Sequence, residues 1–205
     1  MIAITDYGMG NLRSVQKALE RLGAEALVTS DPNDIARADK VILPGVGAFK
    51  DAMDELNSRG LTDAIKTAAA KKPFLGICLG LQLLFEESEE GGTYKGLGIL
   101  PGRVVRFSFD ENAGDEKLKI PHMGWNAVEC DGDVPLFSGL ESGFYTYFVH
   151  SYYVSAENET DVAGRTTYGF TFPCAVQRGN LFATQFHPEK SQQVGMRILQ
   201  NFIDL

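Results

Sequence analysis

Short apolar runs alternate with helical patterns along the first half of the chain, and this alternation constrains the fold more than any other feature. The expected strands are rich in β-branched and aliphatic residues: Ile2–Thr5, Ala26–Thr29, Val41–Leu43 and Phe74–Ile77. The expected helices repeat apolar residues at a helical period: Leu12–Leu22, capped by Asn11, then Phe49–Leu56 and Leu61–Ala70. Asp31-Pro32 is typical of a turn. Strands and helices in alternation predict a parallel sheet with helices on both faces.

The second half of the chain follows a different pattern, because its strand-like runs are separated by Gly, Asp or Asn rather than by helices. These runs are Val104–Phe107, Ala127–Val128, Thr146–Val149, Tyr152–Val154, Cys174–Gln177 and Leu181–Gln185. They predict antiparallel strands added to the sheet. The polar segment Asp110–Lys119 is expected to be an exposed loop, and Gln192–Ile203 an amphipathic helix. We therefore expect an α/β fold: a three-layer, open, mainly parallel sheet with helices on both faces and added antiparallel strands.

Composition narrows the class of protein. The chain has 205 residues, of which 44% are hydrophobic and 22% charged, and its net charge is −8. These are ordinary globular values, and the acidic balance disfavours a nucleic-acid binder. Without repeats or a linker, residues 1–205 are expected to form a single domain. The longest uncharged apolar stretch, Pro73–Phe85, is too short for a membrane span, which needs about 20 residues. Three cysteines and no signal-peptide pattern favour a cytoplasmic protein.

The segment from Gly76 to Gly80 carries the first candidate for chemistry. Cys78 lies where an expected strand meets an expected helix, with a glycine two residues away on each side. This is the nucleophile-elbow pattern with cysteine in place of serine. A helix N-terminus behind the sulfur would favour the thiolate, and the Leu79 N–H, without a helical partner, could donate to an oxyanion. The alternative is a buried structural cysteine between packing glycines.

A thiolate nucleophile needs a base, which is usually a histidine. The chain has only three histidines, at positions 122, 150 and 187. His187 follows the expected strand Leu181–Gln185, and Pro188 keeps it out of helical geometry. Glu189 lies close enough to bond the imidazole and set its tautomer. The alternative is a surface loop in which His and Glu occur together by chance.

Several motifs, taken together, resemble those of the class I (triad) glutamine amidotransferases. The two most specific are GICLGLQLL around Cys78 and FHPEKS around His187. Three more resemble those of the glutaminase subunits of imidazole glycerol phosphate synthases: DYGMGNL from Asp6, PGVGAF from Pro44 and PHMGWN from Pro121. The resemblance runs from Asp6 to Ser191.

This resemblance implies a reaction in which Cys78 attacks the side-chain amide of glutamine. His187 would take the thiol proton and later give one to the departing ammonia, while Glu189 orients His187. The family's oxyanion donors map onto the N–H groups of Leu79 and Val46. Gly45 and Gly47 would allow the strand between them to rearrange when the partner is loaded. The resemblance implies no cofactor and no metal.

Substrate and partner contacts also follow from the resemblance. The family pattern puts four residues near the glutamine: Gln82, Glu90, Ser151 and Tyr152. The acids around Glu90 could instead be a solvated helix end, and His150 is given no catalytic role. Free ammonia needs an acceptor site, which in this family lies on a (β/α)₈-barrel cyclase subunit that forms a heterodimer with the glutaminase. That cyclase makes imidazole glycerol phosphate and aminoimidazole carboxamide ribonucleotide in histidine biosynthesis. The candidate interface residues are Asn11, Met123, Trp125 and Lys190.

Other functions remain open from the sequence alone. Gly8-Met9-Gly10 follows a strand as in a dinucleotide-binding module, but Arg13 stands where that fingerprint needs a third glycine. Another cysteine-triad hydrolase, or a degenerate subunit that only supports its partner, would share parts of the pattern. Within the same class, the alternative is the glutaminase of pyridoxal phosphate synthase, whose oxyanion segment differs from PGVGAF.

Overall fold

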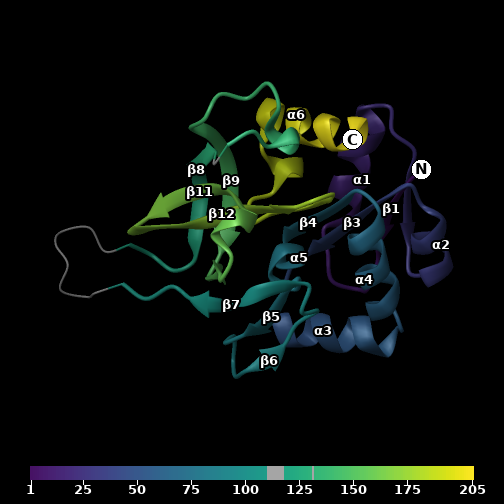
Figure 1. The fold of residues 1–205 in the computed structure, drawn as a ribbon, viewed down its shortest axis with the longest axis horizontal. Helices are drawn as coiled ribbons and strands as arrows, with labels where there is room; N and C mark the ends of the chain where they lie inside the picture. Colours follow the sequence, from purple (N-terminus) through teal and green to yellow (C-terminus); the bar gives the residue numbers. More distant parts are fainter. Residues whose placement is uncertain (110–117, 131) are drawn as a thin grey trace.

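A nine-stranded sheet runs through the molecule, and its first five strands are parallel. The computed structural model describes residues 1–109, 118–130 and 132–205. The order of the sheet is β2-β1-β3-β4-β13-β12-β11-β8-β9 (Figure 1). The parallel strands are β2 (Ala26–Thr29), β1 (Ile2–Thr5), β3 (Lys40–Gly45), β4 (Phe74–Cys78) and β13 (Leu181–Thr184). We call these five strands the parallel half.

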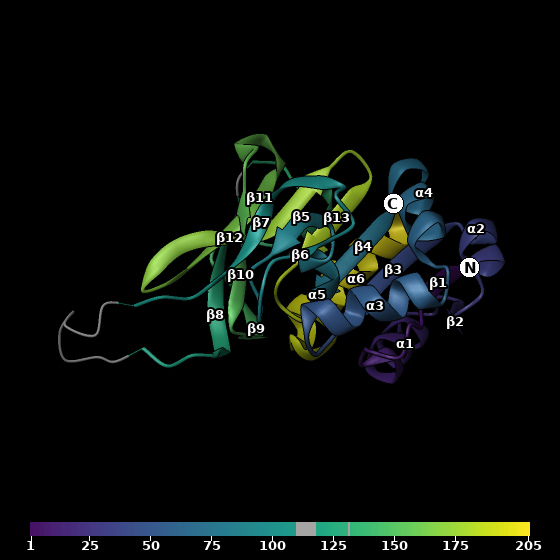
Figure 2. The same cartoon turned by 90° about the horizontal axis from the view of Figure 1, so that it is seen from below.

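The remaining four strands continue the same sheet in antiparallel order, and we call them the antiparallel half. They are β12 (Phe170–Arg178), β11 (Val162–Tyr168), β8 (His122–Cys130) and β9 (Phe144–His150). Figure 2 shows these strands at one end of the molecule and helices α1–α4 at the other. The predicted α/β sheet with added antiparallel strands is confirmed.

A second, four-stranded sheet was not expected from the sequence. Its order is β10 (Tyr152–Ala156), β7 (Leu100–Arg106), β5 (Phe85–Ser88) and β6 (Tyr94–Lys95). Because β10 begins directly after β9, with Ser151 between them, one continuous segment passes from the large sheet to the small one. The run of acids that could have been a helix end is instead β5 and the turn after it.

Helices cover both faces of the parallel half, whose strands consist mostly of apolar residues. Alternate strand residues enter two different cores: Ala3 and Val41 pack on one face, and Ile4 and Ile42 on the other. The first core is covered by α2 (Pro32–Arg37), α3 (Phe49–Ser58) and α4 (Thr62–Lys71). The second is covered by α1 (Leu12–Arg21) and α6 (Gln192–Asp204). Figure 1 shows α6 and α4 on opposite sides of the sheet.

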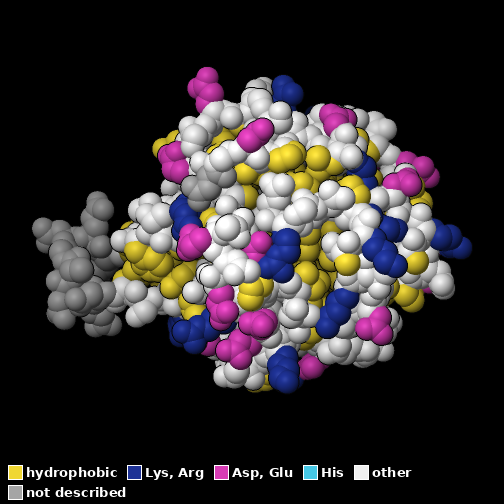
Figure 3. All heavy atoms as spheres, viewed as in Figure 1, with side chains coloured by type: hydrophobic (Ala, Val, Ile, Leu, Met, Phe, Trp, Pro, Cys, Tyr) yellow, Lys and Arg dark blue, Asp and Glu magenta, His cyan; other side chains and the backbone are white. Residues whose placement is uncertain are grey.

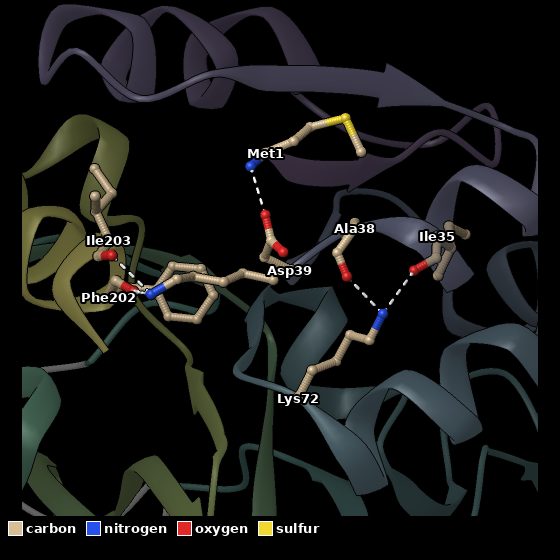
Figure 4. A network of polar contacts seen from close by, with 8 residues as sticks. Met1, Ile35, Ala38, Asp39, Lys72, Phe202 and Ile203 are labelled. Carbon is tan, nitrogen blue, oxygen red and sulfur yellow. Dashed lines mark hydrogen bonds and ion pairs between the residues drawn. The ribbon is translucent and has the colours of Figure 1, made fainter.

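Two lysines close the C-terminal ends of helices, where the last carbonyl groups lack helical partners. Nζ of Lys72 donates to the carbonyls of Ala36 at 2.8 Å and Ala38 at 2.5 Å, at the end of α2. Nζ of Lys40 donates to the carbonyl of Ile203 at 2.7 Å, at the end of α6 (Figure 4). Lys40, from β3, and Lys72, at the end of α4, therefore hold helices on opposite faces of the sheet.

Local differences from the expected elements have simple causes. The Asn11 side chain makes no capping hydrogen bond, although its carbonyl accepts from Val15 N. Asp31-Pro32 begins α2 rather than forming a turn: the Asp31 carboxylate accepts from Asn33 N, and proline is favoured at the first helical position. The strand expected to end at Leu43 continues through Gly45. Most of the loop predicted at Asp110–Lys119 lies outside the described residues.

The surface shows no segregation of charge on the face in view. Figure 3 shows Lys and Arg side chains interspersed with Asp and Glu over this face. No helix in the described part of the chain is both long enough and apolar enough to cross a membrane.

Candidate active site

The backbone of Cys78 is strained at the end of β4. Its φ is 55° and its ψ −108°, a conformation that side chains with a Cβ rarely adopt. The glycines on either side explain how the turn packs. A Cβ at Gly80 would lie 1.8 Å from the carbonyl oxygen of Leu43, and a Cβ at Gly76 would lie 2.9 Å from that of Gly80. The chain therefore needs glycine at both positions to bring Cys78 to this edge of the sheet.

The helix expected behind Cys78 is present but very short. It is the single turn α5 (Leu79–Gln82), after which the chain enters β5. One turn sums few peptide dipoles, so the expected help of a helix dipole to the thiolate is small. The first N–H groups of the turn, including that of Leu79, still have no partner within the helix.

His187 and Glu189 form a buried pair after β13. Nδ1 of His187 lies 2.8 Å from Oε1 of Glu189, and the two side chains are 2% and 1% exposed. The backbone of His187 is held on both sides: its N–H donates to the carbonyl of Tyr147, and its carbonyl accepts from Oγ of Ser191 at 2.7 Å. Because Nδ1 is directed at the carboxylate, Nε2 is the nitrogen left for chemistry.

The environment of His187 favours its protonated form. Burial alone lowers the pKa of the imidazole, but the nearby Cys78 thiol and the hydrogen-bonded Glu189 carboxylate outweigh burial and raise this pKa above its usual value. Within the described residues, Nε2 of His187 has no partner that meets ordinary hydrogen-bond geometry. Cys78 and His187 are therefore close enough to interact, but no hydrogen bond joins them.

Cys78 and His187 both line one cavity of about 370 Å³. Most of the residues singled out in the sequence line it as well: Val46, Gly47, Leu79, Gln82, Glu90, Ser151 and Tyr152. Pro121, Val149 and His150 complete the wall. Two predicted residues do not line the cavity themselves: Glu189 contacts His187, and Gly45 is the last residue of β3. Segments from both halves of the large sheet and from the small sheet thus meet at this cavity.

The segment Pro44–Gly47 borders the cavity and is held from below by Tyr7. The Tyr7 hydroxyl donates to the carbonyl oxygen of Pro44 at 2.9 Å, and burial, with a contribution from Cys78, raises the pKa of this phenol, so it stays protonated. A Cβ at Gly45 would lie 2.4 Å from that hydroxyl. Gly47 has a φ of 104°, which favours glycine, and Val46 is 40% exposed. Sequence reasoning missed Tyr7.

Gln82 and Glu90 already have partners within the protein. Nε2 of Gln82 donates to the carbonyl of Tyr152 at 3.2 Å and to Oε1 of Gln185 at 3.1 Å. Oε2 of Glu90 accepts from Phe49 N at 2.8 Å, at the first residue of α3. Nε2 of Gln185 in turn lies 3.7 Å from the sulfur of Cys78. Sequence reasoning missed Gln185, although an amide at the end of a buried apolar strand was a signal for it.

Three of the four candidate interface residues are close to one another. Met123 and Trp125 are 60% and 46% exposed and share the outer face of β8. The Trp125 ring meets Tyr147 edge-on at 6.2 Å between centroids, and Nζ of Lys190 lies 5.9 Å from the Tyr147 ring centroid. Asn11 lies directly before α1, and α1 contacts the short turn Pro188–Lys190 that holds Lys190. Among residues 1–109, 118–130 and 132–205, no group of three or more His, Cys, Asp or Glu side chains could hold a metal ion.

Known proteins share both the sequence and the fold of this chain. A family model described as glutamine amidotransferase class-I matches residues 3–205. The imidazole glycerol phosphate synthase subunit HisH of Syntrophotalea carbinolica is 59% identical over 206 residues, covering 100% of both chains. That of Rhodopirellula baltica is 56% identical, covering 98% of this chain and 96% of the relative.

Solved structures show the same fold at much lower identity. A crystal structure of a glutamine amidotransferase matches with a TM-score of 0.74 at 21% identity, covering 100% of this chain and 98% of that one. The structure of PurLQS from Thermotoga maritima matches with a TM-score of 0.72 at 20% identity, covering 99% and 97%. From the family model and the sequence relatives, the chain belongs to the class I glutamine amidotransferases and, within them, to the HisH subunits of imidazole glycerol phosphate synthase.

Proposed function

We propose that this chain hydrolyses the side-chain amide of glutamine with Cys78 as nucleophile, His187 as acid and base, and Glu189 as the group that orients His187. The sulfur attacks the amide carbon, and Nε2 of His187 holds the proton that the thiol gives up. Collapse of the tetrahedral intermediate breaks the C–N bond, and the same proton leaves with ammonia. Water then attacks the thioester, His187 removes a proton from it, and glutamate and the free thiol result.

The buried pair of His187 and Glu189 supports this division of roles. Its Nδ1···Oε1 contact keeps the second nitrogen facing the cavity, and the raised pKa of His187 favours an imidazolium able to protonate a leaving amine. The amide of Gln185 is directed at the sulfur and helps to hold it in place.

The negative oxygen of the tetrahedral intermediate would be held by the N–H groups of Leu79 and Val46. Both residues border the cavity beside Cys78. Gly47 tolerates either sign of φ, so the Val46 peptide can turn toward the cavity when the partner is loaded. Gln82, Glu90, Ser151 and Tyr152 surround the remaining space and would contact the amino and carboxylate groups of glutamine.

The ammonia would pass to a second chain, since an amine released into water at neutral pH is protonated and lost. We propose the cyclase subunit of imidazole glycerol phosphate synthase, a (β/α)₈ barrel, as that partner in a cytoplasmic heterodimer. In this assignment residues 1–205 act as one domain. The aromatic face of β8, with Met123 and Trp125, and nearby Lys190 would form the docking surface, with Asn11 at its edge.

The observation that carries the proposal is that Cys78, on a strained turn, and His187, paired with Glu189, line one cavity. The test compares glutamine-driven with ammonium-driven synthesis by the reconstituted complex. Cys78→Ala should abolish the first and retain the second, because the cyclase site is untouched. Cys130→Ala, which removes a thiol from β8 outside the cavity, serves as control and should retain both. Equal loss of both activities in Cys78→Ala would contradict the proposal.

A further inference from the structure

Two buried histidines that the mechanism does not use face each other across β8 and β9. His122 and His150 are opposite residues in the strand register and are 3% and 6% exposed. Nδ1 of His122 lies 2.9 Å from Nε2 of His150. Burial lowers the pKa of His122 to about 4 and that of His150 to about 3, so both rings are neutral at physiological pH. A neutral imidazole has one donor and one acceptor, and the direction of each hydrogen bond therefore matters.

The tautomers of the two rings follow by elimination from their partners. Nδ1 of His150 lies 2.8 Å from the carbonyl oxygen of Tyr152, which can only accept, so this nitrogen carries the hydrogen. Nε2 of His150 must then accept from Nδ1 of His122, and Nε2 of His122 must accept in turn. Its partner is Nδ2 of Asn126, at 3.1 Å. The amide of Asn126 is oriented independently, because its oxygen accepts from Ala127 N and its nitrogen also donates to the carbonyl of Thr167.

The same chain of hydrogen bonds continues to the nucleophile. The carbonyl of Tyr152 also accepts from Nε2 of Gln82, which donates its second hydrogen to Gln185, whose amide is directed at the sulfur of Cys78. Every donor and acceptor in this chain is used in a consistent direction. A continuous buried network therefore links β8, whose outer face carries Met123 and Trp125, to the sulfur of Cys78.

We propose that His122 and His150 are positioning residues for glutamine, which fix the Tyr152 carbonyl and, through it, the Gln82 and Gln185 amides. The proposal rests on the proposed glutaminase function and deepens it. Removing the donor at His122 leaves Nε2 of His150 buried without a partner. The imidazole of His150 is then held only by its hydrogen bond to the Tyr152 carbonyl, because Nε2 gains no partner in either tautomer. The wall of the cavity formed by Ser151 and Tyr152 would lose its fixed position.

The first test reads the tautomers directly. Because the chain has only three histidines, ¹⁵N correlation spectra of the ring nitrogens resolve each of them in the intact protein. At pH 7 both His122 and His150 should be neutral with the hydrogen on Nδ1. A hydrogen on Nε2 of His150, or a charged ring at either position, would overturn the proposal.

The second test separates positioning from stability in the complex with its cyclase. His122→Phe keeps the ring that stacks on Phe148 and Tyr168 but deletes both nitrogens. It should raise the KM for glutamine about 3- to 10-fold, the range for one lost hydrogen bond, with a smaller change in kcat. His122→Asn restores a donor at the position of Nδ1 and should recover most of the affinity. A merely structural role would reduce the melting temperature and active fraction in both variants without moving KM, and that result would overturn the proposal.

A third variant tests the proposal even if His122→Phe does not fold. Asn126 is half-buried at the far end of the chain of hydrogen bonds. Asn126→Leu removes the donor to Nε2 of His122 and also the side-chain bonds to the Thr167 carbonyl and Ala127 N, while leaving both histidines in place. It should raise the KM for glutamine by a smaller factor than His122→Phe does. An unchanged KM would contradict the coupling between Asn126 and the substrate site.

Failure of the proposed function and failure of the positioning role give different results. A wild-type complex without Cys78-dependent ammonia release overturns the proposed function, whereas an active complex with unchanged KM in these variants overturns only the positioning role.

Discussion

The two halves of the large sheet differ in how deeply their strands are buried and in which side chains they bury. In the parallel half every residue of β1, β4 and β13 is buried, because helices or other strands cover both faces. In the antiparallel half burial alternates along β9, from Phe144 to His150. The inner face there contains polar side chains such as Thr146 and His150, and the outer face exposes rings such as Tyr145, which is 59% exposed.

The difference is consistent with the roles proposed for the two halves. A strand buried on both faces is packed from both sides and can hold Cys78 in a strained conformation. A strand with one open face can meet a partner on the outside while its inner face fixes polar groups near the substrate. The cavity lies where the two halves meet, so neither half supplies a complete site.

The largest effect is expected at the buried pair of His187 and Glu189, which follows β13 at the cavity. Glu189→Gln keeps the shape of the side chain but removes the charge, so the pKa of His187 should fall and the imidazole should lose its fixed orientation. We expect kcat for glutamine hydrolysis to decrease by roughly 10²–10⁴, the scale of a misplaced acid–base group. Glu20→Gln, on the exposed side of α1, should have no effect. A kcat within a factor of about three of wild type would contradict the role given to the pair.

The same variant has a distinct pH signature. A folded-state pKa that is raised stabilises the protein fully below the unfolded pKa of about 6.5 and loses that contribution as the pH rises through the folded value. The free energy of unfolding of the wild type should therefore fall with pH above about 6.5, and in Glu189→Gln this fall should end at a lower pH. Urea denaturation across pH 6 to 10 and ¹⁵N titration of His187 measure the two effects.

A second prediction compares the tolerance of the two halves to one added methyl group. Gly80→Ala should lower the free energy of unfolding by about 3 kcal/mol, because the new Cβ overlaps the Leu43 carbonyl and the turn cannot yield cheaply. Gly164→Ala, on β11, would meet the Val128 side chain at 3.2 Å and the Glu129 carbonyl oxygen at an ordinary 3.4 Å, and should cost about 1 kcal/mol or less. Urea denaturation measures both. Equal losses would mean that the parallel half is no more tightly packed than the antiparallel half.

The smallest effect is expected on the open face of the antiparallel half. Trp125→Ala should weaken binding of the cyclase subunit by about 2 kcal/mol, the usual loss for a central aromatic anchor, and leave the free energy of unfolding nearly unchanged. Leu27→Ala, an exposed apolar residue on β2 at the other end of the sheet, is the matched control and should not alter binding. Calorimetric titration of the cyclase distinguishes them, and equal weakening would show that the docking surface is not the face of β8.

The sequence predicted the parallel half well because its signals are local. Ile2–Thr5 and Ala26–Thr29 are strands with the expected bounds, and the glycines around Cys78 indicated the turn directly. The rest of the chain was predicted less well. The strands β7 and β10 were expected, but β5, β6 and β11 were missed, and so was the pairing that makes a separate small sheet. The acids after Phe85 suggested a helix end, but the helix stops at Gln82, and Phe85 and Ser88 are buried in β5. The pairing of β5 with β7 makes this segment a strand, and no short window of sequence contains both partners.

The site was predictable where a motif holds the residues close together, and not where distant segments meet. Cys78, His187 and Glu189 follow from their own segments. The pairing of His122 with His150 depends on the register of β8 and β9, and the contacts of Gln185 and Tyr7 depend on how strands stack in the sheet. Both kinds of information require the folded chain.

The place of β13 in the sheet has a consequence for synthesis of the protein. This strand is the last to be made, yet it lies in the middle, between β4 and β12. Until it leaves the ribosome, β4 has an open edge of unpaired backbone groups beside Cys78, and His187 does not yet exist. In the proposed mechanism the nascent chain would therefore carry Cys78 without its base, and ammonia release could begin only after His187 has been added and β13 has joined the sheet.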